Sequence, residues 1–185
     1  MNILLGSNSP RRNELLRQLA VDFKKVHISC NEDFNNDMPV RDVAEFLALK
    51  KSSAYNNLRS NDLLITADTT VVVGNEILNK PRDFQESVSM LKKLEGKQHS
   101  VITGVCLRSI DEIESFSVET LVTVGPVSAV DVGYYLNNFK PYDKAGSYGI
   151  QEWFGLTQVS SIEGCYYNVV GLPCNELYKR LKKYL

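Results

Sequence analysis

The sequence predicts an α/β fold, a mixed sheet with flanking helices. Apolar runs of strand length alternate along the chain with amphipathic runs of helix length. Residues 99–107 and 116–124 alternate in polarity across a short connection, which favours a hairpin and therefore an antiparallel pair within the sheet. No repeat, low-complexity tract or Pro/Gly/Ser-rich linker divides the 185 residues. We therefore expect one domain over residues 1–185.

Composition excludes several classes of protein. Lys and Arg total 21 against 22 Asp and Glu, and this near-zero net charge argues against a nucleic-acid-binding protein. No apolar run approaches the roughly 20 residues that span a bilayer, so we expect no membrane partner. The N-terminus lacks the pattern of a signal peptide, and the four cysteines form no C-x-x-C pair. We expect a cytoplasmic protein with reduced cysteines.

The first elements have clear local signals. Residues 2–5 predict a short buried strand that leads into the polar segment 6–9. A helix then begins, with Ser9 as its N-cap and Pro10 in its first turn. Its apolar side comprises Leu15, Leu16, Leu19 and Ala20, and a second helix is expected over 40–57.

Two strands are expected around a polar stretch, and three more helices follow. Residues 63–65 and 71–73 predict strands that flank residues 68–70. Asp83 and Glu86 have the spacing of a capping box, which opens a helix. The remaining signals are Gly96 at the end of that helix, Ser128 and Asp131 at the start of the next, and Leu177, Leu181 and Leu185 along a C-terminal helix.

Two arginines stand where a helix favours acidic residues. Arg11 and Arg12 occupy the first turn, at the positive end of the helix dipole, which costs about 0.3–1 kcal/mol per cation at an exposed site. A bound anion would reverse that cost. Free backbone N–H groups, the hydroxyls of Ser7 and Ser9 and the two guanidinium groups would together hold a phosphate. The alternative is a solvated pair of surface arginines.

Asp68 is a carboxylate between apolar strand segments. It follows residues 63–67 and precedes 71–73, where buried side chains are expected. A carboxylate in such a place is paired, binds a metal or acts as a general base. The alternative is an ordinary aspartate in a turn.

Two further segments carry polar groups that could bind a ligand. Lys80 precedes the rigid Pro81, and the segment 143–151 contains two glycines and ends in Gln151. Glycines permit a ligand to approach the backbone closely, and the Gln151 amide could read a base edge through its donor and acceptor. The alternative is a loop with structural glycines. His99 is expected to be a partly buried, satisfied residue and the basic run 179–183 a solvated face.

Together these segments resemble the Maf family of nucleotide pyrophosphatases. Six motifs occur in family order and cover nearly the whole chain. They are Ser7-x-Ser9-Pro10-Arg11-Arg12-x-Glu14-Leu15-Leu16, Ala67-Asp68-Thr69 with Val71, Leu78-x-Lys80-Pro81, His99-x-Val101-x-Thr103-Gly104-Val105, Asp143-Lys144-Ala145-Gly146-x-Tyr148-Gly149-Ile150-Gln151, and Asn168-Val169-Val170-Gly171-Leu172-Pro173.

The resemblance implies hydrolysis of a nucleoside triphosphate to the monophosphate and pyrophosphate, with Mg²⁺ or Mn²⁺. It also implies an elongated, two-lobed Maf/ITPase-like fold with a central cleft, and a homodimer. Within the family, the residue types at Arg11, Thr69 and Gln151 match the branch that prefers dTTP and UTP. Modified pyrimidine nucleotides are a further substrate class, and the activity would cleanse the nucleotide pool.

The resemblance also assigns roles to individual residues. Asp68 falls on the catalytic acidic position, where it would orient or deprotonate the attacking water. Glu32 falls near the metal with Asp68, and the groups expected on the phosphates are Ser7, Arg11, Arg12, Lys51 and Lys80. An alternative is a nucleotide-sensing binder that regulates cell division, with incidental turnover, but a binder would not need the Asp68 carboxylate.

Overall fold

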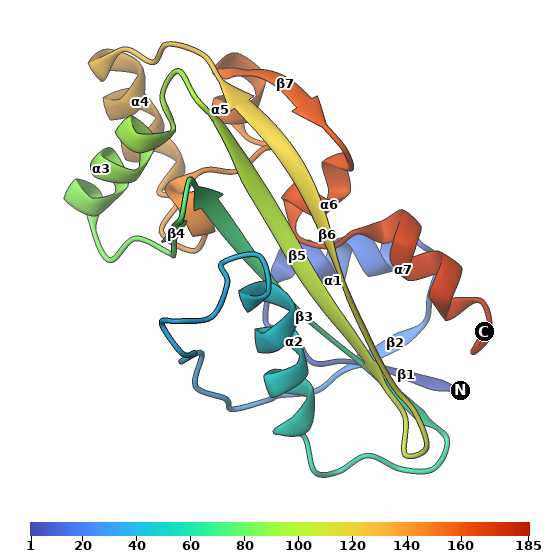
Figure 1. Ribbon diagram of the computed structural model, residues 1–185. Helices are drawn as coiled ribbons and strands as arrows, with labels where there is room; N and C mark the ends of the chain where they lie inside the picture. The colour runs from blue at the N-terminus through green and yellow to red at the C-terminus, as the bar shows by residue number, and fades with distance from the viewer. The chain divides into compact units, whose positions relative to one another are not determined.

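The structure is a computed structural model that describes residues 1–185, and it confirms the α/β class. A seven-stranded sheet has the order β2-β1-β3-β5-β6-β7, and β4 pairs with β3 (Figure 1). The strands are β1 (Asn2–Leu5), β2 (Phe23–Lys25), β3 (Asp62–Val73), β4 (Glu76–Leu78), β5 (Gln98–Arg108), β6 (Ile113–Val124) and β7 (Val159–Glu163).

Seven α-helices and one 3₁₀ helix connect the strands. They are α1 (Pro10–Gln18), α2 (Val43–Ser53), α3 (Phe84–Leu94), α4 (Ala129–Phe139), the 3₁₀ helix η1 (Ala145–Ser147), α5 (Trp153–Thr157), α6 (Tyr166–Val170) and α7 (Cys174–Leu181). No helix of this chain has the length and apolar character needed to cross a lipid bilayer.

The sheet is mixed, as the sequence predicts. Strand β1 runs parallel to both β2 and β3, whereas β3 with β4 and β6 with β7 are antiparallel. Strands β5 and β6 are neighbours joined by residues 109–112, where the Ser109 N–H donates to the Glu112 carbonyl (2.9 Å). So short a connection requires an antiparallel pair, which confirms the hairpin.

The chain divides into two compact units, each assembled from separate stretches of sequence. Strands β3, β5 and β6 contribute residues to both units. The prediction of a single domain over residues 1–185 stays a prediction. The first unit comprises Met1–Thr69, Thr103–Val118 and Gly171–Leu185, and the second comprises Thr70–Ile102 and Glu119–Val170.

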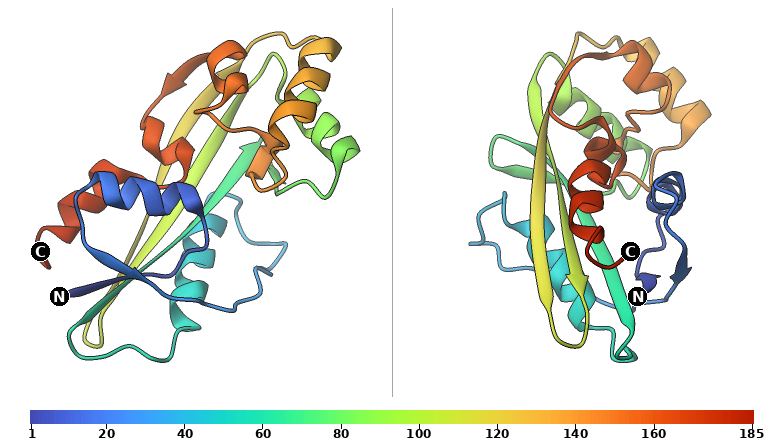
Figure 2. Two further views of the ribbon diagram at one scale, coloured as in Figure 1. Left: turned by 180° about the vertical axis from the view of Figure 1, so that it is seen from behind. Right: turned by 90° about the vertical axis from the view of Figure 1, so that its right-hand side faces the viewer.

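In the first unit, α1 and α7 cover one face of the strands and α2 covers the other (Figure 2). Helix α2 lies very close to β5, because a Cβ at Gly104 would stand only 2.3 Å from backbone atoms of Ala44. Glycine is therefore required for this approach. The approach fixes α2, the helix that carries Lys51.

In the second unit, a continuous apolar core holds the helices on the strands. Helix α3 packs against α4 and η1. Tyr135 of α4 and Phe154 of α5 are fully buried, and Tyr148 and Ile150 lie in the same core. The loop after η1 is thus anchored by apolar side chains on both sides of Gly149.

Several details of the sequence prediction are wrong in extent. The first helix ends at Gln18, because Ala20 adopts a left-handed backbone with φ of 56°. The second helix covers only Val43–Ser53 of the expected 40–57. Residues 62–73 form one continuous strand and not two strands around a polar turn. Strand β3 pairs with β1 over residues 62–65 and with β4 over residues 71–73, and its other neighbour in the sheet is β5.

The basic C-terminus is largely exposed, as the sequence suggests, and Arg180 is the exception, because it is partly buried. Arg180 lies over the Phe116 ring, with 4.3 Å between Cζ and the ring centroid. Its guanidinium binds Glu114 and Glu176, and Lys183 binds Glu112. Acidic residues of the β5–β6 hairpin and of α7 itself thus pair with the basic run.

Candidate functional site

Asp68 lies within β3 and is 9% exposed. The alternative of a turn aspartate is therefore wrong. A carboxylate in a strand with buried neighbours needs a compensating charge. Lys51, in the last turn of α2, supplies it through an ion pair between its Nζ and Asp68 Oδ1.

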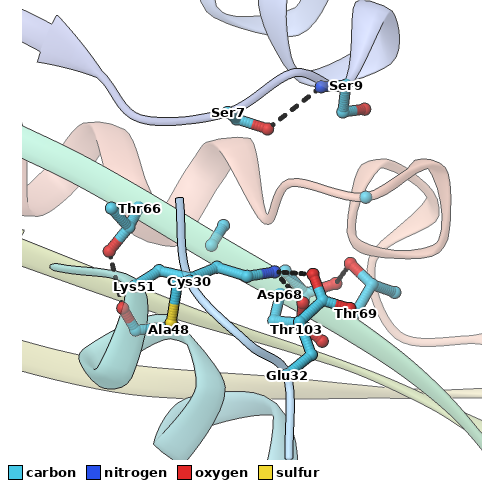
Figure 3. A network of polar contacts seen from close by, with 12 residues as sticks. Ser7, Ser9, Cys30, Glu32, Ala48, Lys51, Thr66, Asp68, Thr69 and Thr103 are labelled. Atoms are coloured by element: carbon cyan, nitrogen blue, oxygen red, sulfur yellow. Dashed lines mark hydrogen bonds and ion pairs between the residues drawn. The ribbon is translucent and has the colours of Figure 1, made fainter. Parts of the chain in front are cut away.

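A second carboxylate binds the same ammonium group. Glu32 Oε1 lies 2.8 Å from Lys51 Nζ, so that Lys51 stands between Glu32 and Asp68 (Figure 3). The side chains of Lys51 and Asp68 are 15% and 12% exposed, whereas that of Glu32 is 52% exposed. Lys51 thus joins a buried carboxylate to one that solvent reaches.

Glu32 and Asp68, which meet at the Lys51 ammonium, are the carboxylates that would hold a magnesium ion. Mg²⁺ is usually bound through one or two carboxylates, with water and substrate phosphates in its other positions. Glu32 and Asp68 meet that description. No group of three or more His, Cys, Asp and Glu side chains is placed to hold a metal ion. An ion here would therefore depend on the nucleotide for part of its coordination.

The start of α1 is organised by serine hydroxyls. Ser9 is the N-cap, and its Oγ accepts from the Arg12 N–H (3.4 Å), as the sequence predicts. The Ser9 N–H in turn donates to Ser7 Oγ (3.2 Å), which orders the segment before the helix (Figure 3). Arg11 lies beside this segment in the first turn, where a phosphate would find backbone N–H groups and a cation.

Arg12 is directed toward the protein. Its Nε donates to the Gly171 carbonyl (2.8 Å) and its Nη1 to the Ala67 carbonyl (2.9 Å). Further bonds run from Nη1 to Ser7 Oγ (3.4 Å) and from Nη2 to Thr69 Oγ1 (2.9 Å). Burial lowers the pKa of the guanidinium, and the charge of Asp68 opposes that effect. The guanidinium therefore makes four hydrogen bonds to other groups of the protein.

Thr69 receives a second polar contact from the neighbouring strand. Its Oγ1 lies 2.9 Å from Thr103 Oγ1, and Arg12 donates to the same oxygen. Because Thr103 is fully buried on β5, the Thr69 hydroxyl has a defined orientation. The sequence does not predict Thr103 or the Gly171 carbonyl as partners, although both residues belong to the Maf-like motifs.

The structure divides the predicted residues between the two units. Lys80 and Gln151 belong to the second unit, where a bond from the Gly146 N–H to the Asn79 carbonyl (3.2 Å) joins their two segments. Gln151 is exposed and lies in a turn. The residues grouped in the first unit are Ser7, Arg11, Arg12, Glu32, Lys51, Asp68 and Thr69.

Comparison with known proteins gives consistent matches over nearly the whole chain. A dTTP/UTP pyrophosphatase of Porphyromonas gingivalis is 45% identical over 186 residues, covering 98% of this chain and 94% of that protein. A protein of the same name from Flavobacterium psychrophilum is 44% identical, covering 95% of this chain and 91% of that protein. One from Bacteroides thetaiotaomicron is 40% identical, covering 98% of this chain and 95% of that protein.

A solved structure and a family model complete the comparison. The Staphylococcus aureus Ham1 protein aligns with 67% of this chain and 72% of its own, at 16% identity and a TM-score of 0.49. The model of the family described as Maf-like protein matches residues 2–184. On that match and on the sequence relatives, this chain belongs to the family of Maf-like proteins.

Proposed function

We propose that this chain hydrolyses dTTP and UTP to the nucleoside monophosphate and pyrophosphate. Relatives 40–45% identical over almost the whole chain are named dTTP/UTP pyrophosphatases, which supports both the reaction and the substrates. The observation that carries the proposal is the Asp68 carboxylate, buried in β3 and paired with Lys51.

Hydrolysis at the α-phosphorus needs a positioned water and compensation of the charge on the leaving pyrophosphate. Asp68 orients the water and accepts its proton. Lys51, which contacts Asp68, and Arg11 at the start of α1 contribute positive charge for the phosphate oxygens. Lys80 is assigned to the phosphates as well. A Mg²⁺ or Mn²⁺ ion, when bound by Glu32 and Asp68, would lower the pKa of a bound water.

Arg12 has a different task from the one that the sequence suggests. Its bonds to Gly171, Ala67 and Thr69 occupy most of the guanidinium. We therefore assign it to positioning β3, next to Asp68, and not to direct phosphate binding. Thr69, held by Arg12, and Gln151 are assigned to the base, whose pyrimidine edge offers carbonyl acceptors and an N–H donor.

The same proposal includes the assembly and location expected from the sequence. We place the protein in the cytoplasm as a homodimer, with a nucleoside triphosphate as its substrate and no nucleic-acid or membrane partner. These statements follow from composition and from the family resemblance.

The test is pyrophosphate release from a panel of nucleoside triphosphates with Mg²⁺, Mn²⁺ or EDTA. We expect rapid release from dTTP and UTP that requires the metal. Asp68→Asn removes the proton acceptor and should lower kcat by about 10²–10⁴, with nucleotide binding retained. Asp22→Asn, which alters an exposed aspartate, is the matched control and should leave kcat unchanged.

The outcomes separate an enzyme from a binder. Near-wild-type turnover in Asp68→Asn would remove Asp68 from its role. Nucleotide binding without pyrophosphate release from any member of the panel would instead favour the nucleotide-sensing alternative.

A further inference from the structure

A single buried hydroxyl holds both ends of the turn that carries Gln151. Residues 149–152 form a β-turn closed by a bond from the Glu152 N–H to the Gly149 carbonyl (3.1 Å), with Gln151 third. The Tyr135 Oη of α4 accepts from the Gly149 N–H (3.0 Å) and donates to Glu152 Oε2 (2.6 Å). One side chain thus binds the first and the last residue of the turn.

The Glu152 carboxylate binds groups outside the helix that follows it. Glu152 stands at the N-cap position of α5, and its side chain makes no capping bond. Its second oxygen, Oε1, lies 2.9 Å from Lys144 Nζ, and Lys144 also binds Asp143 (2.8 Å). The carboxylate is therefore used to hold the turn and not to cap the helix.

The surroundings of the turn are buried in the core of the second unit. Tyr135 is fully buried, and Ile150 lies in the same core, so the exposed Gln151 stands directly after an anchored residue. A Cβ at Gly149 would lie 2.7 Å from Glu152 Cδ, so glycine is what lets the carboxylate reach Tyr135. Burial, assisted by the bond to Glu152, raises the pKa of Tyr135, and its hydroxyl therefore stays protonated as a donor.

We propose that Tyr135, Glu152 and Lys144 are positioning residues that orient the Gln151 amide and so set the base preference. The inference rests on the proposed function, in which Gln151 contacts the base. An amide discriminates between bases only if its donor and acceptor point in fixed directions, because a mobile amide can rotate to suit another edge. The bonds at residues 149 and 152 hold the turn, and therefore the backbone position and direction from which the Gln151 side chain projects.

The test compares kcat/KM for dTTP, UTP and dGTP in a small set of variants. Tyr135→Phe removes only the hydroxyl, and we expect the preference for pyrimidine over purine to fall about three- to tenfold, the effect of one hydrogen bond. Glu152→Gln should act in the same direction. Tyr134→Phe removes a hydroxyl from the next, half-exposed residue of α4 and should leave the preference unchanged.

A double variant distinguishes positioning from general destabilisation. If Tyr135 acts through Gln151, Tyr135→Phe should have no further effect on the preference in a Gln151→Ala background. Amide hydrogen exchange across residues 145–153 gives a readout that needs no turnover. Exchange should accelerate in Tyr135→Phe and stay unchanged in Tyr134→Phe.

The possible failures are distinct. An equal loss of kcat/KM for every nucleotide, additive effects in the double variant, or unchanged exchange in Tyr135→Phe would each overturn the inference and leave the proposed function in place. A wild-type protein that protects the turn from exchange but hydrolyses neither dTTP nor UTP would instead overturn the proposed function, and with it the specificity role.

Discussion

Arg12 shows that the residue type at a position does not determine where its side chain points. A cation in the first turn of a helix indicates an anion nearby, and Arg11 still fits that interpretation. The guanidinium of Arg12 instead donates to the Gly171 and Ala67 carbonyls and to Thr69. Gly171 is 159 positions away in the sequence, and no local pattern predicts that contact.

Replacing Arg12 with lysine should expose this role. Lysine keeps the charge but loses the planar arrangement of donors, so the three partners cannot all be reached. We expect Arg12→Lys to lower the free energy of unfolding by about 2–4 kcal/mol, measured by urea denaturation. Arg11→Lys is the control and should change it by less than about 0.5 kcal/mol. Equal stability of the two variants would contradict the assignment.

The residues of the candidate site were predictable only to the extent that the motifs carry them. Asp68 draws attention on its own, because a carboxylate between apolar runs is unusual. Glu32 had no local signal beyond its charge, and the structure nevertheless brings it to Lys51. Tyr135 and Glu152 were missed, because their bond is formed between a helix interior and a loop that are separate in sequence.

At the scale of elements, local signals were sufficient where a helix begins with a capping side chain. Ser9, Asp83 and Ser128 cap α1, α3 and α4 as predicted, because each cap bond involves a neighbour three residues away. Of the short elements, β1 was predicted, but several others were not. Elements such as β2, β4, β7 and α6 have only three to five residues, and for the strands pairing with distant neighbours defines them.

One arginine of helix α7 makes both a stacking contact and an ion pair with β6. Arg180 stacks on Phe116 and binds Glu114 of the hairpin, so Arg180→Met should lower the free energy of unfolding by about 1–3 kcal/mol. Lys179→Met is the matched control, because Lys179 makes only an exposed contact with Glu176 (3.4 Å). Urea denaturation of both variants gives the comparison, and equal losses would show that Arg180 has no special role.

For the whole molecule, the buried His99 predicts a loss of stability in mild acid. Burial lowers the pKa of His99 from 6.5 to about 4, and its Nε2 lies 2.7 Å from Tyr148 Oη. Between these values the unfolded chain binds a proton that the folded chain does not. Stability therefore falls as the pH drops from 6.5 to about 4, by about 3 kcal/mol at most.

Urea denaturation across that pH range measures the effect. His27, the other histidine, is exposed, so His27→Gln should follow the wild-type curve. His99→Gln should lose less stability than the wild type as the pH falls toward 4.5. Glu112 and Glu114 contribute little to the change in stability above pH 4.5, because their pKa values are lowered. Parallel curves for His99→Gln and the wild type would show that the histidine does not cause the loss.

The close approach at Gly104 has a consequence for how this chain can vary over generations. The position of α2, and therefore that of Lys51, depends on the absence of a side chain at residue 104. Glycine is then the only residue that this position accepts. Among tolerated substitutions, residue 104 would therefore be as invariant as a catalytic residue, although its role is to leave room for α2.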